Sequence, residues 1–153
     1  MEEDEYRNTY QQFNQIQCAF EKAVLTRRCN CRHAHKFCLA EREGIACQSA
    51  PEQQRCLRFL QLVREKSQFV LKLTRPGEPL PHAKAIKVQL GSLNGLAEVL
   101  EISIQDNEID DIDGLLSRAE QAYSGLDNLP FDTLIRAINV TQGRRARSRK
   151  PKS

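Results

Sequence analysis

All six cysteines of this 153-residue chain lie between Cys18 and Cys56, and the rest of the chain has none. Two of them form the step Cys29-Asn30-Cys31, and His33 and His35 follow shortly afterwards. Thiolates and imidazoles are the preferred ligands of soft and borderline metals. The segment therefore predicts metal or redox chemistry, although it names neither a substrate nor a pathway.

The composition describes a globular chain of one-domain size, with 40% hydrophobic and 28% charged residues. No apolar run approaches the roughly 20 residues that cross a bilayer. Four of the first five residues are acidic, and this start lacks the basic and apolar regions of a signal peptide. These features predict a cytoplasmic protein without a membrane span, and a reducing compartment favours metal or redox roles for cysteines over disulfides.

Apolar residues recur every three or four positions over 6–25, which predicts a helix. Residues 83–101 are ambiguous, because Ile86, Val88 and Leu90 alternate as in a strand. We favour a helix there, since no second strand is evident to pair with it. Together with the other periodic segments, the pattern predicts an all-α protein of five to six helices. The remaining helices are expected over 32–43, from the capping box Ser49–Glu52 to about 73, over 111–124, and over 131–142.

The predicted organisation is a single helical domain over residues 1–142, followed by a basic, disordered tail over 143–153. Within the domain, a cysteine-rich half (1–73) is joined to a second helical half (83–142) by a proline-rich connector (74–82). The tail holds six Lys and Arg residues, so the domain itself has a net negative charge.

Four of five cysteines are expected to ligate one metal centre. The Cys29-Asn30-Cys31 step places two sulfurs on one short loop, and neighbouring helices are expected to supply the others. The candidate ligands are Cys18, Cys29, Cys31, Cys47 and Cys56. Cys38 lies between two apolar residues and is interpreted as a packing residue. An iron–sulfur cluster is favoured as the cofactor, and zinc is the alternative.

Other interpretations of the cysteines remain open. The spacing matches neither paired C-x₂-C zinc knuckles nor the ferredoxin run, and all six thiols are also suited to packing in a core. His33 or His35 would complete a zinc site with Cys29 and Cys31. Reversible disulfide formation between Cys29 and Cys31 is a further use of the same residues, although the ring would be strained.

An enzyme is not expected. Arg27, Arg28 and Arg32 flank Cys29 and Cys31 and are predicted to lower the pKa of these thiols, as in a nucleophile. However, neither a catalytic base nor an oxyanion site is recognisable. The acidic stretch 106–113 fails the EF-hand spacing and is interpreted as acidic residues at a helix N-terminus.

The basic tail indicates contact with a polyanion or an acidic protein partner. It has no aromatic residues for base stacking. The residues expected to make this contact are Arg144, Arg145, Arg147, Arg149, Lys150 and Lys152. A solvated terminus without a specific partner is an equally open interpretation.

Three segments carry a resemblance: residues 18–22, residues 28–31 and residues 79–89, followed by the Arg-rich tail. They resemble small cysteine-rich proteobacterial proteins of unassigned function, which implies a bacterial cytosolic origin and no activity. The sequence as a whole predicts a non-enzymatic metal-binding protein with a role in redox sensing, electron transfer or as an accessory subunit. The alternative is a structural or zinc-stabilised interaction module whose basic tail docks on nucleic acid or an acidic protein.

Overall fold

The computed structural model describes residues 3–72, 78–104 and 108–141. Along the chain the elements are α1 (Glu3–Phe13), α2 (Glu21–Leu25), β1 (Ala34–Leu39), β2 (Arg42–Cys47), α3 (Ala50–Ser67), α4 (His82–Val99), α5 (Ile112–Tyr123), the 3-10 turn η2 (Leu126–Asn128) and α6 (Phe131–Val140). The predicted all-α class is therefore wrong. The described residues form a mixed fold of six helices and a two-stranded antiparallel sheet.

The sheet replaces the helix that was predicted over 32–43. Strand β1 pairs with β2 from Ala34↔Cys47 to Leu39↔Arg42. The two-residue loop between them, Ala40-Glu41, has φ values of 50° and 66°. These are the positive values of the turn type that suits hairpins, but neither residue is the usual Asn or Gly. The hairpin therefore has no sequence signature at its turn.

The helix predicted over 6–25 is also interrupted. Helix α1 ends at Phe13, and the following residues run beside the open edge of β2. The amide of Cys18 donates to the carbonyl of Ile45 at 3.0 Å, and the amide of Cys47 donates to the carbonyl of Ile16 at 2.8 Å. Backbone pairing with β2 thus takes the place of a continuous helix, and only the short α2 follows.

The second half of the fold agrees with the sequence pattern. Helices α4, α5 and α6 lie where helices were predicted over 83–101, 111–124 and 131–142. Helices α4 and α6 pack very closely, because α4 presents two glycines to α6. A Cβ atom on Gly91 would lie 2.4 Å from Cα of Ile138, and one on Gly95 would lie 2.9 Å from Cα of Leu134. Such contact requires residues without a side chain.

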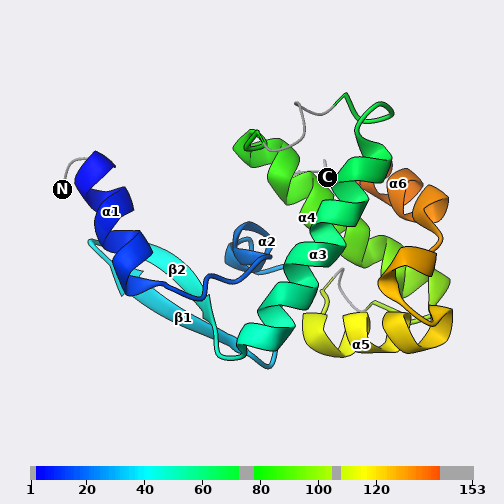
Figure 1. Cartoon of the computed structure of the whole chain (residues 1–153), viewed down its shortest axis with the longest axis horizontal. Coiled ribbons are helices and arrows are strands. Elements are labelled where there is room, and N and C mark those ends of the chain that lie inside the picture. Colours follow the sequence, from blue (N-terminus) through cyan, green and yellow to red (C-terminus); the bar gives the residue numbers. More distant parts are fainter. Residues whose placement is uncertain (1–2, 73–77, 105–107, 142–153) are drawn as a thin grey trace, which may run out of the picture.

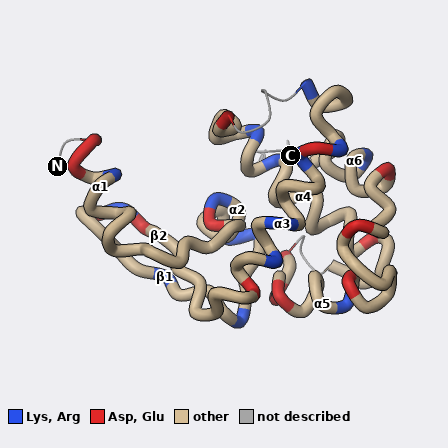
Figure 2. The backbone as a smooth tube through the Cα atoms, in the orientation of Figure 1, with Lys and Arg blue, Asp and Glu red and all other residues tan. Residues whose placement is uncertain are grey.

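Helices α2 to α6 enclose the core, and α1 and the hairpin lie to one side of them (Figure 1). Phe20, Phe59 and Leu93 are fully buried in this core. By contrast, α1 has no buried residue. Acidic and basic residues are both spread over the described backbone (Figure 2). The basic tail lies outside the described residues, as does part of the proline-rich connector.

Candidate metal centre

Four of the five candidate ligands line one cavity of about 20 Å³. Each comes from a different segment: Cys18 from the connection between α1 and α2, Cys31 from the loop before β1, Cys47 from the last position of β2, and Cys56 from α3. The hairpin brings Cys31 and Cys47 together, because β2 runs antiparallel to β1 and Cys47 at its end pairs with Ala34 at the start of β1. The sequence pattern had no means of showing this return.

These four thiols are close enough to affect each other's ionisation. The pKa of Cys18 is raised to about 12, first by burial and further by the charges of Cys31 and Cys47. Burial also raises the pKa of Cys56 to about 12, and the charges of the other three thiols add to the rise. Mutual repulsion of thiolates is the electrostatic sign of a shared site, and a bound cation would relieve it.

The flanking arginines were predicted to lower the pKa values of Cys29 and Cys31, but the net shift of both pKa values is upward. Burial raises the pKa of Cys29 to about 12, and the opposing effect of Arg28 is smaller. The pKa of Cys31 is also raised by burial. The guanidinium group of Arg32 lies 2.7 Å from the Asp111 carboxylate, with which it forms an ion pair. Without a metal these thiols are therefore neutral at physiological pH and poor nucleophiles.

Backbone amides nevertheless point at two of the sulfurs. The N–H of Phe20 donates to Cys18, and the N–H groups of His33 and Asp113 donate to Cys31. Such donors favour the thiolate over the thiol, and hydrogen bonds to sulfur are among the means by which proteins tune iron–sulfur centres. The thiol of Cys47 has a different partner, since its Sγ donates to the carbonyl of Ser49 at 3.2 Å.

Three ionisable side chains also line the cavity, and each of them already has an ionisable neighbour. Asp113 is 7% exposed, and its carboxylate accepts from Arg55 of α3. Its other oxygen lies 3.3 Å from Nε2 of His33. Glu52 pairs with the same arginine at 2.8 Å. These contacts tie α3 and α5 together behind the thiols.

The thiols surround space rather than a single point. Among the residues that the structure describes, no three His, Cys, Asp or Glu side chains are arranged to hold one metal ion as they stand. The cavity of about 20 Å³ is large enough for a water molecule, which requires about 10–15 Å³. A space of this size is nearer to that of a single ion than to that of a polynuclear cluster, so the four sulfurs would have to move apart to hold a cluster.

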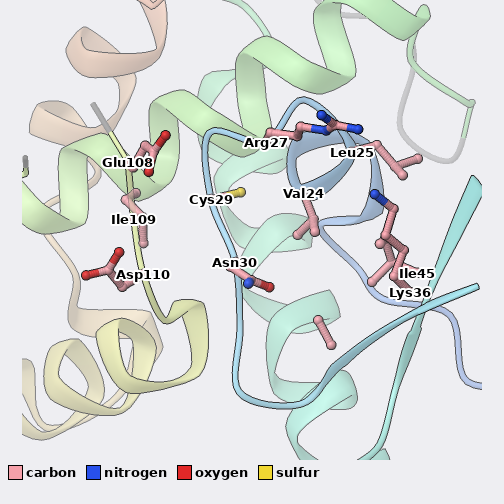
Figure 3. Close-up of a pocket in the computed structure, with 11 residues that line it drawn as sticks. Val24, Leu25, Arg27, Cys29, Asn30, Lys36, Ile45, Glu108, Ile109 and Asp110 are labelled. Carbon is pink, nitrogen blue, oxygen red and sulfur yellow. The ribbon is translucent and has the colours of Figure 1, made fainter. Parts of the chain in front are cut away.

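Cys29 does not line the four-thiol cavity. It is 5% exposed and borders a separate, open cavity of about 470 Å³. In Figure 3, Glu108 and Asp110 lie on one side of the Cys29 loop, and Arg27 and Lys36 lie on the other. The charge of Cys18 still contributes to the raised pKa of Cys29, so this thiol is a neighbour of the four.

The other sequence candidates lie elsewhere. Cys38 was interpreted as a packing residue, but its side chain is exposed on β1. It lies next to the hairpin turn, beyond the part of β1 that packs against the core, which a helical periodicity could not reveal. His35 is likewise exposed on β1, so His33 is the histidine that borders the four thiols.

No family model, curated protein or solved structure matches this chain. Within the described residues, no helix is long and apolar enough to cross a membrane.

Proposed function

We propose that this chain is a metal-binding protein in which Cys18, Cys31, Cys47 and Cys56 ligate one iron–sulfur centre. The observation that carries the proposal is the convergence of these four thiols, from four separate segments, on one cavity. A core that used cysteines only as small apolar residues would have no reason to gather them.

The cavity, which has about the volume of one water molecule, does not select a cluster over a single ion, and the sulfurs would have to move apart to hold a polynuclear centre. The donor set is what favours a cluster, because thiolates are the ligands of iron–sulfur clusters. When bound, the cluster would supply one-electron redox chemistry. The chain supplies the four sulfurs, the amide donors to Cys18 and Cys31, and the apolar burial.

A role in electron transfer or redox sensing follows from the position of the site. Cys56 is buried, whereas Cys18, Cys31 and Cys47 are half-buried. One side of the centre therefore lies near solvent, where a redox partner or an oxidant can approach. We do not propose an enzymatic reaction.

The test is anaerobic purification, or reconstitution with ferrous iron and sulfide, followed by iron and sulfide analysis and visible absorption spectroscopy. Replacing Cys18, Cys31, Cys47 or Cys56 with serine should abolish the absorption and most of the bound iron. The matched controls are Cys38→Ser, on exposed β1, and Cys29→Ser, outside the cavity; both should retain the cluster. Cys29→Ser separates this ligand set from one that includes the full Cys29-Asn30-Cys31 step.

Two results would change the conclusion. Wild-type protein that binds one zinc ion through the same four cysteines, and no iron or sulfide, would favour the zinc-stabilised interaction module. Protein that binds neither metal under anaerobic conditions, with six titratable thiols, would show that the cysteines serve packing alone.

A further inference from the structure

The cysteines of the proposed centre stand where the chain passes between two parts of the fold. We call α1, residues 14–17 and the β1–β2 hairpin the arm, and helices α2 to α6 the helical body (Figure 1). The first passage from arm to body begins at Cys18. The chain returns to the arm just after Cys31, and leaves it again directly after Cys47. The fourth ligand, Cys56, belongs to the body.

The arm is held together by its own contacts. The rings of Tyr10 and Phe13 pack against Phe37 of the hairpin, with ring centroids 5.8 and 4.9 Å apart. Arg42 of β2 forms an ion pair with Glu3 at 3.1 Å. Residues 16–18 pair with the edge of β2 through the backbone. All of these bonds lie inside the arm, so the arm can move as one unit.

Few side chains attach the arm to the helical body apart from the four-thiol site. Ile45 is 2% exposed and packs in the core cluster. The carboxylate of Glu21 in α2 accepts from the amide of Ile45 at 2.8 Å and from the hydroxyl of Tyr10. The helix α1 buries none of its residues. Ala34 of β1 also packs against the core cluster, and the side chain of Gln53 in α3 donates to the carbonyl of Gln17 at 3.1 Å. Within the described residues, the attachment outside the four-thiol site thus consists of a small set of contacts.

We infer that the metal centre is a clamp that fixes the orientation of the arm relative to the helical body. The inference rests on the proposed function and adds a regulatory consequence to it. Three ligands at the passages and a fourth on α3 would be joined by one rigid centre. Loss of the centre would leave only the contacts of Ile45, Ala34, Glu21 and Gln53 between the described parts, and the arm would pivot at the three passages.

The pivot would reshape the open cavity of about 470 Å³ shown in Figure 3. Its walls belong to both parts, because Lys36 and Ile45 come from the arm, whereas Glu108 and Asp110 come from the helical body. Loading or loss of the centre would therefore change a surface that lies outside the ligand set. This is how a redox or metal signal at the thiols would be passed to the outside of the protein.

A distance measurement across the two parts tests the clamp. A ketone-bearing amino acid is placed at His35, exposed on β1, and at Arg118, exposed on α5, and both are coupled to nitroxides by oxime chemistry. This chemistry leaves the cysteines untouched. Pulsed electron–electron double resonance then gives the distribution of distances between the two nitroxides. It is recorded for the anaerobically loaded protein and for metal-free protein kept reduced with a phosphine.

The loaded protein should give one narrow distribution, and the metal-free protein a broader one with a shifted mean. Cys31→Ser and Cys56→Ser should resemble the metal-free protein, whereas Cys38→Ser should resemble the loaded one. Circular dichroism establishes that each variant is folded. If metal analysis confirms removal of the centre and the distribution does not change, the clamp is wrong and the metal site stands. If the wild type binds no metal, the clamp and the proposed function both fall.

Discussion

Arg55 of α3 donates to the carboxylate of Asp113 of α5, and both residues are largely buried behind the four-thiol cavity. Arg55 also donates to Ser117 at 2.9 Å. The carboxylate thus links two helices, while its own backbone N–H points at Cys31. The position of one ligand sulfur therefore depends on an ion pair between helices that do not themselves carry that ligand.

Removal of this arginine should destabilise the protein strongly. Arg55→Met would leave the buried carboxylate of Asp113 with only His33 and Arg32 nearby, and we expect a loss of about 3 kcal/mol in the free energy of unfolding. Urea unfolding measures the loss. Arg58→Met is the matched control, because Arg58 pairs with Asp127 on the surface and should cost less than about 1 kcal/mol. Equal losses in the two variants would contradict the role of burial.

Gly44 cannot accept a side chain in the present packing. A Cβ atom there would lie 2.3 Å from Cζ of Phe37, its partner across the hairpin. Gly44→Ala should force the ring away from α1 and cost about 1–3 kcal/mol. Thermal unfolding followed by circular dichroism checks this. In a Phe37→Ala background the same substitution should cost much less, and a full cost there would show that the clash is not the cause.

The hairpin turn carries backbone strain that glycine would relieve. Glu41 has φ of 66°, a left-handed conformation that costs an ordinary residue about 1–2 kcal/mol. Glu41→Gly should raise the free energy of unfolding by up to about 1 kcal/mol, after the added freedom of the unfolded chain is subtracted. His35→Gly is the control, because the same freedom is added on a strand and should destabilise. A loss of stability in Glu41→Gly would argue against the turn.

The thiols of the metal-free, reduced protein should react at very different rates with an aromatic disulfide reagent. Cys38 is exposed and should react first. Cys29 and Cys56 are buried, and burial raises the pKa of each to about 12, so they should react only when the protein opens. The rates follow from absorbance, and peptide mapping assigns them. Six equal rates in the folded protein would contradict this burial.

The metal-free protein should lose stability in alkali. The folded pKa of Cys18, Cys29 and Cys56 is about 12, above the value of about 8.5 of an unfolded cysteine. The folded state therefore holds these protons more tightly. The resulting contribution to the free energy of unfolding is fully present below about pH 8.5 and is lost as the pH rises through the folded pKa. Urea unfolding at a series of pH values measures this, and Cys29→Ala should flatten the dependence whereas Cys38→Ala should not.

The helices of the second half were predictable because their own residues carry the signal. Helix α4 has ten buried residues at helical spacing, and the alternative strand reading of Ile86, Val88 and Leu90 had no partner strand. The start of α3 after Ser49 was also predicted, although the structure gives no side-chain capping bond from Ser49 itself. In such segments local periodicity and burial agree.

The hairpin was not predictable from the same patterns. Its turn, Ala40-Glu41, lacks the residues that mark hairpins, and each strand has only six residues. What stabilises the hairpin is Phe37 packed over Gly44 and against α1, a set of contacts between segments distant in sequence. Helical periodicity read over 32–43 could not include these contacts.

The sequence by itself determined that thiols suited to a metal are concentrated in residues 18–56, and it placed the later helices. Only the tertiary structure decided which thiols meet. It did so because the hairpin brings Cys47 back to Cys31, and the pairing of residues 16–18 with β2 brings Cys18 to the same place. Cys29 points instead into the neighbouring cavity. Spacing along a chain limits the ligands, but the direction of each side chain depends on strand pairing and burial, which distant residues decide.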